Sequence, residues 1–183
     1  MNIAENKKIL LFFGLIRDYK GLETLIKSIV LLPKDYFLVI AGECYGDFSK
    51  YQLLIDENNL SDQILVHNKF INDDEVKYYF SGADVLVLPY KEATQSGVIA
   101  ISNHFCLPAI ASKVGGLPQM ILHNAEGLIV DENSPQGFSS SFEHYFNENL
   151  KTMNHFKKMY KVTIKVFLQK MLSFSSIMYV FRC

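Results

Sequence analysis

Short apolar segments alternate with segments of helical periodicity along most of the chain, and this alternation constrains the fold more than any other feature. The apolar segments are continuous, as in strands that are buried on both faces. Such strands, separated by helices, indicate a parallel sheet with helices on both sides. The expected strands cover residues 8–14, 36–42, 63–68, 84–89, 108–112 and 127–131, and the expected helices cover 20–32, 47–58, 73–83, 98–105, 117–123 and a region from 135 onward.

Right-handed crossovers between such strands predict an α/β fold of the Rossmann-like type, a doubly wound parallel sheet of about six strands. The 183 residues suffice for one domain with a sizeable core, which we place at residues 1–150. We expect residues 151–183, which mix basic and apolar residues, to be a helical tail. The tail suits an amphipathic helix that docks on a partner domain or a membrane surface, and a helix covering the core or a poorly specified chain end are the alternatives.

The composition argues against several classes of function. The formal net charge is −1, so no basic field predicts a nucleic-acid partner. Cys44, Cys106 and Cys183 are widely separated and form no Cys-x-x-Cys pair, which argues against a disulfide framework and a structural zinc site. No segment reaches the roughly 18 apolar residues that span a bilayer. We therefore expect a cytoplasmic protein, with peripheral membrane contact through the tail as a further expectation.

The loop after the first strand is the first candidate site, because ligands of such sheets bind at the carboxyl ends of the strands. It carries Gly14, Arg17, Lys20 and Gly21. Glycine lets the backbone approach a ligand, and two cations near a helix N-terminus suit a phosphate, with solvated surface charges as the alternative. The loop lacks the Gly-x-Gly-x-x-Gly motif of dinucleotide sites and the lysine motif of P-loops.

The polar turn between the fourth strand and the next helix is the second candidate. Thr94, Gln95 and Ser96 provide hydroxyl and amide donors, and Gly97 leaves the first N–H groups of the helix open to an anion. A plain helix cap by Thr94 or Ser96 is the alternative, but one residue would suffice for that. Gly115 and Gly116, after the fifth strand, fall at the same edge of the sheet. Three loops of this kind at one edge favour a ligand site.

The order of these segments resembles a known family. The segments FFGLIRDYKGLETLIKSI, VIAGE, ADVLVLPY, ATQSGVIAIS, PAIASKVGGLPQMI and EGLIVD follow one another as in the carboxy-terminal domain of retaining glycosyltransferases of family 4, or group 1. The resemblance covers about residues 8–150. It implies the carboxy-terminal half of a GT-B fold, in which two Rossmann-like domains face each other across a cleft and the carboxy-terminal one binds a nucleotide sugar.

The resemblance implies a function and a set of site residues. The donor would be a UDP- or GDP-sugar, used without a metal or other cofactor, and the sugar would pass to an acceptor in glycan or polysaccharide biosynthesis. Arg17 and Lys20 correspond to the basic pair that neutralises the donor diphosphate, and the ATQSGV turn corresponds to a segment whose amides hold the phosphates and the sugar. No catalytic residue is assigned, and the implied donor-binding residues are Gly14, Arg17, Lys20, Glu92, Thr94, Gln95, Ser96, Gly97 and Val98.

The chain departs from the family's pattern at its acidic positions. Members place two glutamates eight positions apart around this turn, and the second binds the donor ribose. That second position falls near Ile101 or Ser102, while Glu92 stands near the first and Gln95 is closer to it in register. Gln119 occupies a position where many relatives have glutamate. We interpret these departures as the mark of a subgroup with an ATQSG-type turn.

The resemblance places an acceptor-binding domain on the amino-terminal side, and this sequence does not include it. We therefore expect a donor-binding half that is inactive or weak by itself and that acts with such a domain or with a partner chain. A non-catalytic nucleotide-sugar-binding module is the alternative function. A domain of an NAD-dependent oxidoreductase is disfavoured because the Gly-x-Gly-x-x-Gly motif is absent.

Overall fold

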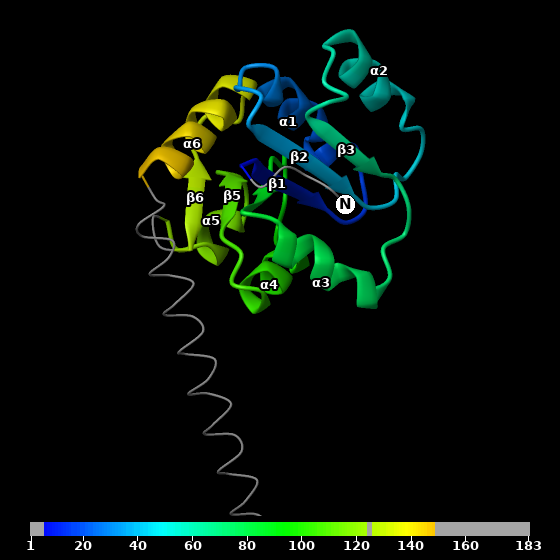
Figure 1. Cartoon of the computed structure of the whole chain (residues 1–183). Coiled ribbons are helices and arrows are strands. Elements are labelled where there is room, and N and C mark those ends of the chain that lie inside the picture. Colours follow the sequence, from blue (N-terminus) through cyan, green and yellow to red (C-terminus); the bar gives the residue numbers. More distant parts are fainter. Residues whose placement is uncertain (1–5, 124–125, 149–183) are drawn as a thin grey trace, which may run out of the picture.

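Six parallel strands form the centre of the structure, in the order β3-β2-β1-β4-β5-β6 (Figure 1). The computed structural model describes residues 6–123 and 126–148, so the predictions for the tail at 151–183 lie outside the described residues. The parallel, doubly wound arrangement confirms the predicted Rossmann-like α/β fold. The strands are β1 (Lys8–Phe13), β2 (Tyr36–Ala41), β3 (Ile64–His67), β4 (Val85–Leu88), β5 (Ala109–Ser112) and β6 (Gly127–Val130).

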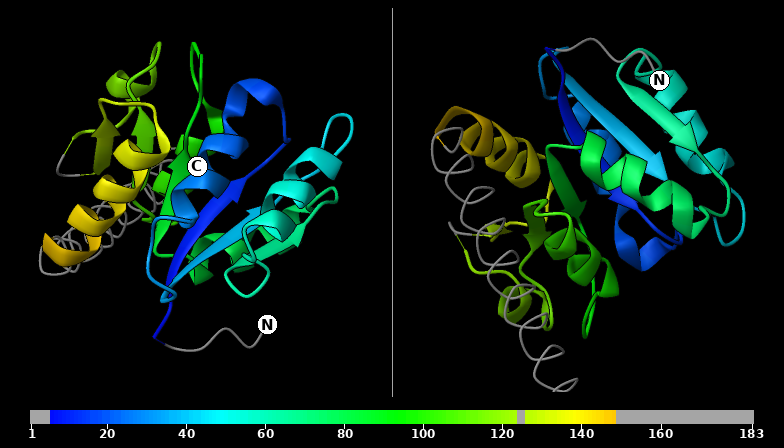
Figure 2. Two further views of the ribbon diagram at one scale, coloured as in Figure 1. Left: turned by 90° about the horizontal axis from the view of Figure 1, so that it is seen from above. Right: turned by 60° about the horizontal axis from the view of Figure 1, so that its bottom comes forward.

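Alternate residues of β1, β2, β4, β5 and β6 enter two separate cores, which explains why these strand segments are apolar throughout. In β1, Leu10 and Phe12 enter one core, and Leu11 and Phe13 enter the other. Helices α1 (Leu22–Ile29), α2 (Ser49–Glu57) and α6 (Pro135–Glu148) cover the first face, and α3 (Asp73–Gly82), α4 (Gly97–His104) and α5 (Leu117–Met120) cover the second (Figures 1 and 2).

The first helical region differs from its prediction. A helix over residues 20–32 was expected, whereas the structure has a short 3-10 helix η1 (Asp18–Lys20) followed by α1. Gly21 separates the two with φ of 69°, a left-handed conformation that favours glycine. Because of this break, Lys20 lies outside the regular helix, in the loop that follows β1 at the carboxyl edge of the sheet.

The start of α3 follows its prediction closely. Asn72 is the N-cap residue, and its backbone N–H donates to Glu75 Oε2 at 3.2 Å. Asp73 and Asp74 lie exposed in the first turn, where negative charge stabilises the helix dipole. Among the helices of residues 6–123 and 126–148, none combines the length and the apolar character needed to cross a bilayer.

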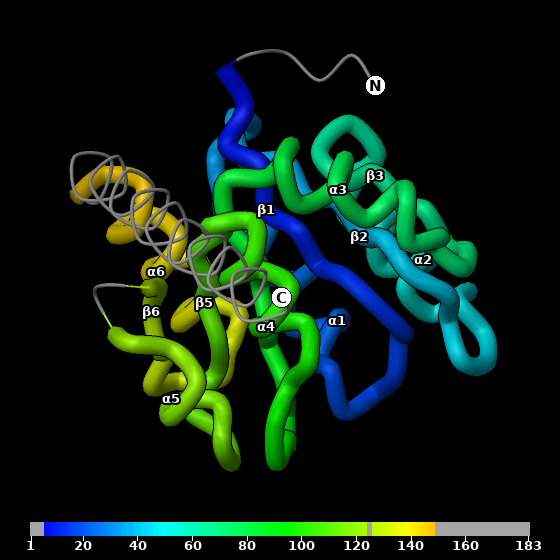
Figure 3. The backbone as a smooth tube through the Cα atoms, turned by 90° about the horizontal axis from the view of Figure 1, so that it is seen from below, coloured from blue at the N-terminus to red at the C-terminus, as the bar shows by residue number. Residues whose placement is uncertain are grey.

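The strand order places a topological switch point between β1 and β4. These two strands are neighbours, with Leu10 paired to Val85, and the chain winds outward from them in opposite directions. Ligands of open α/β sheets bind in the crevice at such a point, outside the carboxyl ends of the strands. Two of the three predicted loops follow β1 and β4, and the backbone tube, seen from below, shows them at the same end of the sheet (Figure 3).

Candidate functional site

Direct backbone contacts join the loops that follow β1 and β4. The N–H of Lys91 donates to the carbonyl of Tyr19 at 2.7 Å. A β-carbon on Gly21 would stand 1.8 Å from the carbonyl oxygen of Pro89, so only glycine permits this approach. Main-chain contacts therefore hold the two loops together beside the switch point. We call the space outside the strand ends at this point, where ligands of such sheets bind, the crevice.

Lys20 is a buried cation in this crevice. Only 8% of the residue is exposed, and among the described residues no acidic side chain forms an ion pair with its ammonium group. Burial lowers the pKa of Lys20, and the nearby charge of Arg17 lowers it further. Its Nζ lies 3.4 Å from the point where a β-carbon of Gly14 would stand. A buried, unneutralised cation beside glycine backbone is a favourable position for an anion.

Val98, in the first turn of α4, also lies next to Gly14. Its Cγ2 lies 3.7 Å from the position of a β-carbon on Gly14. Gly97, at the start of α4, is exposed and has no atom within 4 Å of the place where its β-carbon would be. The structure thus brings Gly14, Lys20, Gly97 and Val98 together at the N-terminus of an eight-residue helix, whose first N–H groups carry partial positive charge.

Arg17 lies in the same loop but is exposed. Its guanidinium lies over the ring of Tyr45, 4.5 Å from the centroid. Tyr45 follows β2, and its N–H donates to the carbonyl of Ile16 at 3.0 Å. Of the basic pair, Lys20 is therefore largely buried, whereas Arg17 is a surface cation that packs against Tyr45 in the loop after β2.

Ser96 is the N-cap residue of α4, but within the described part of the chain its hydroxyl makes no capping bond. It pairs instead with the hydroxyl of Tyr90, at 3.2 Å, and both side chains are buried. The capping alternative considered for this turn therefore does not describe Ser96. Glu92, Thr94 and Gln95 are exposed on the outer side of the turn.

The loop after β5 supports the turn from the other side. The N–H of Gly116 donates to the carbonyl of Ala93 at 3.2 Å, and a β-carbon on Gly115 would stand only 1.6 Å from that carbonyl oxygen. Between this loop, the turn and η1 lies an open hollow of about 670 Å³. Its lining residues are Tyr19, Lys91, Glu92, Ala93, Thr94, Gln95, Val114 and Gly115.

Three residues at or near positions where the resemblance implies an acidic residue, Ile101, Ser102 and Gln119, are not acidic. Ile101 is half-buried against the core of the second face, and Ser102 is fully buried with its hydroxyl bonded to the carbonyl of Ile99 at 2.8 Å. Gln119 is exposed on α5. In residues 6–123 and 126–148, no group of three or more His, Cys, Asp and Glu side chains is arranged to hold a metal ion.

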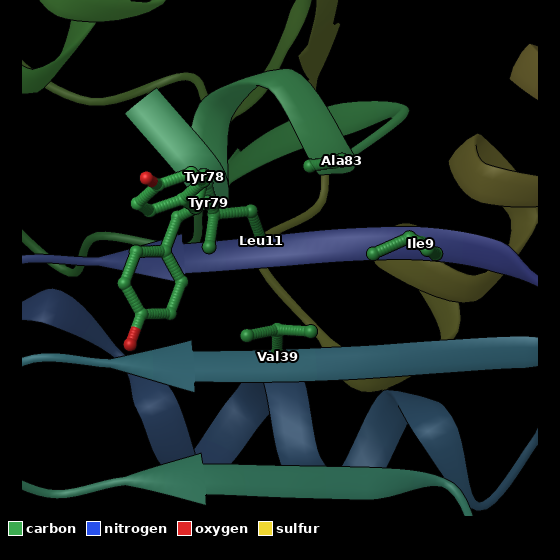
Figure 4. Close-up of a pocket in the computed structure, with 7 residues that line it drawn as sticks. Ile9, Leu11, Val39, Tyr78, Tyr79 and Ala83 are labelled. Carbon is green, nitrogen blue, oxygen red and sulfur yellow. The ribbon is translucent and has the colours of Figure 1, made fainter. Parts of the chain in front are cut away.

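A second, apolar hollow lies apart from these loops (Figure 4). It has a volume of about 330 Å³ on the second face of the sheet, beside α3. The hydroxyl of Tyr79 is directed to His67 Nδ1, at 2.7 Å. None of the predicted donor-binding residues belongs to it, and its lining residues are Ile9, Leu11, Val39, Tyr78, Tyr79, Gly82 and Ala83.

Sequence reasoning did not identify the aromatic residues of the crevice. Tyr90 is 2% exposed, its ring centroid lies 5.9 Å from that of Tyr19, and Lys20 Nζ lies 5.8 Å from it. The ring of Tyr45 packs against the guanidinium of Arg17. Tyr90 begins the polar turn, but a tyrosine after an apolar strand is also typical of ordinary core packing. Only its neighbours in space distinguish it.

A family model and the curated relatives of this chain point to the same family. The model of the family "Glycosyl transferases group 1" matches residues 1–162. A D-inositol 3-phosphate glycosyltransferase of Pseudarthrobacter chlorophenolicus is 31% identical over 147 residues, which are 76% of this chain and 34% of that protein. The chain thus spans about a third of the length of this curated relative.

Solved structures share the fold. The carboxy-terminal domain of LpcC, a group 1 family glycosyl transferase of Francisella tularensis, superposes with a TM-score of 0.72 at 18% identity and covers 85% of each chain. HepE of Anabaena, in complex with UDP and glucose, gives a TM-score of 0.74 at 16% identity, over 92% of this chain and 48% of HepE. These structures are GT-B glycosyltransferases: the LpcC structure is a carboxy-terminal domain, and the likeness covers about half of HepE.

Proposed function

The chain belongs to the group 1 glycosyl transferases, and we propose that it is the donor-binding domain of a retaining enzyme that transfers a sugar from a nucleotide diphosphate sugar to an acceptor. One observation carries the proposal. Lys20 is largely buried, its ammonium group has no acidic partner among the described residues, and both this group and Val98 of α4 lie next to Gly14. This combination of cation, glycine backbone and helix N-terminus suits a diphosphate.

Charge stabilisation is the chemical task of such a site. When the bond between the sugar and the diphosphate breaks, the leaving oxygen gains negative charge. Lys20 and the first N–H groups of α4 are fixed before the reaction, so they stabilise that charge without reorganising. Arg17, oriented by Tyr45, adds a second cation at the outer side of the crevice. Glu92, Thr94 and Gln95 line the open hollow and supply polar groups for the sugar hydroxyls.

The donor in this proposal is a UDP- or GDP-sugar, and the chain uses no cofactor. The UDP and glucose in the HepE complex support a nucleotide sugar as the ligand of this fold. An amino-terminal acceptor-binding domain, or a partner chain that carries one, completes the enzyme, since the chain covers only 34% of its curated relative. Polysaccharide biosynthesis, a cytoplasmic location and peripheral membrane contact by residues 151–183 belong to the same proposal.

Calorimetric titration with UDP, GDP, ADP and their sugars tests the proposal, followed by a transfer assay with the amino-terminal half of a group 1 relative added as a separate chain. We expect binding of a uridine or guanosine diphosphate and sugar transfer only when both chains are present. Binding without turnover in any reconstituted pair would favour the non-catalytic module, which the lack of an acidic side chain at Ile101 and Ser102 also permits. Absence of binding to every nucleotide in the panel contradicts both functions.

Gly97→Ala tests whether the ligand occupies the space next to the N-terminus of α4. No atom lies within 4 Å of the new methyl group, and alanine improves helix propensity, so we expect the free energy of unfolding to stay the same or to rise by about 0.5–1 kcal/mol. We expect nucleotide affinity to fall by about tenfold, because the methyl group enters the space of the ligand.

Gly82→Ala on α3 is the matched control for this change. It also adds a methyl group in open space within a helix, but far from the crevice, and should leave affinity unchanged. Thermal unfolding and calorimetric titration of both variants measure the two quantities. Equal affinities of Gly97→Ala and the wild type would remove α4 from the proposed site.

A further inference from the structure

Tyr90 connects the parts of the crevice that come from different loops. It stands two residues after Leu88, the last residue of β4, and is almost completely buried. Its ring lies near the Lys20 ammonium and packs edge-on against Tyr19, both from the loop after β1. Its hydroxyl pairs with Ser96 at the start of α4. One side chain thus contacts the buried cation and the N-cap residue of the helix.

The backbone of Tyr90 is fixed independently of its side chain. Its carbonyl accepts two hydrogen bonds, from Ser112 Oγ at 2.6 Å and from Asn133 Nδ2 at 2.8 Å. Ser112 belongs to β5, and Asn133 precedes α6. Because these bonds do not involve the phenol, removal of the Tyr90 hydroxyl leaves the course of the chain at this point supported.

The bond to Tyr90 takes Ser96 out of its ordinary role. A serine at an N-cap position normally accepts a hydrogen bond from an N–H group of the first helical turn. Here the Ser96 hydroxyl pairs with the phenol instead, and α4 receives no capping bond from it. A hydroxyl has one hydrogen to donate and can accept two bonds. If the phenol donates, the hydrogen of Ser96 stays available for another acceptor.

We propose that Tyr90 is a positioning residue of the phosphate site. Its phenol donates to Ser96 Oγ, which holds the serine side chain in an orientation that does not cap α4 and directs the serine hydrogen toward the bound diphosphate. The N–H groups of the first turn are then available to the same anion, and the Tyr90 ring supports the Lys20 ammonium from the side. This inference rests on the proposed function, because it assigns a role within the same donor site.

Tyr90→Phe tests the inference. It removes only the phenol oxygen, and the ring stays beside Lys20. Ser96 is then free to rotate and cap α4, so the melting temperature should stay the same or rise slightly. Affinity for the nucleoside diphosphate that the wild type binds should fall by about five- to tenfold, the size of one or two hydrogen bonds.

Tyr145→Phe is the matched control. Tyr145 is also 2% exposed and donates its hydroxyl to the carbonyl of Asp84 at 3.1 Å, next to β4 but at its amino end. Losing this bond should lower the melting temperature and leave nucleotide affinity unchanged. The two tyrosine variants therefore have opposite expected profiles, which a general packing effect would not produce.

A double-mutant cycle with Ser96→Ala tests whether Tyr90 affects nucleotide affinity through Ser96. If Tyr90 acts through Ser96, Tyr90→Phe has no further effect on affinity in the Ser96→Ala background. Additive losses would contradict the positioning role, and so would a Tyr90→Phe variant that binds like the wild type. If the wild type itself binds no nucleotide in the panel, the proposed function has failed, and this inference falls with it. A failure of the inference alone leaves wild-type binding intact.

Discussion

Lys20→Met should weaken binding of a nucleoside diphosphate by roughly 10- to 100-fold, as expected for loss of a charge-assisted bond. Methionine fills a similar volume without the charge. The folded protein should be as stable as the wild type or more stable, because burial and Arg17 both disfavour the charged form of Lys20. Calorimetric titration measures the affinity, and urea denaturation measures the free energy of unfolding.

Lys27→Met is the control for this prediction. Lys27 is an exposed lysine of α1 that pairs with Glu23 at 2.6 Å, and its loss should leave nucleotide affinity unchanged. If both lysine variants bind like the wild type, Lys20 is not part of the site. A large loss of stability on Lys20→Met would show that the ammonium has a structural partner.

The pH dependence of binding gives a second readout of the same residue. In the free protein the pKa of Lys20 is lowered, chiefly by burial, and a bound diphosphate would raise it. Between these two pKa values the complex holds more protons than the free protein. Affinity should therefore be constant at lower pH and fall as the pH rises through the pKa of free Lys20. The Lys20→Met variant should lack this decrease on the alkaline side.

Gly21→Ala should lower the free energy of unfolding by about 3 kcal/mol, the combined size of backbone strain and overpacking. The new β-carbon would stand 1.8 Å from the carbonyl oxygen of Pro89, and φ at this position is 69°. Both loops of the crevice would have to move apart. We therefore expect loss of nucleotide binding together with the loss of stability, measured by urea denaturation and calorimetric titration.

Gly82→Ala again provides the comparison, because its methyl group meets no atom within 4 Å. It should leave the free energy of unfolding within about 1 kcal/mol of the wild-type value. If Gly21→Ala were equally mild, the close approach of the two loops would not exist in solution. The crevice would then be wider at its base than the structure shows.

Features that depend on neighbouring residues could be predicted from the sequence, whereas features that depend on distant residues could not. Continuous apolar segments predicted all six strands within about one residue at each end, because strands that are buried on both faces of a sheet are apolar throughout. The same reasoning extended the first helix backward over Lys20. It missed the left-handed Gly21, since the need for glycine there comes from Pro89, which is distant in the sequence.

Sequence alone determined the fold class, the edge of the sheet where the loops gather, and the residue types at that edge. The tertiary structure decided which of these residues share an environment. It buried Lys20 and exposed Arg17, and it paired Ser96 with Tyr90. The physical reason is that a buried strand depends on the apolar character of residues that are adjacent in the sequence. Burial of a charge and the partner of a hydroxyl depend instead on which segments the β1–β4 pairing brings together.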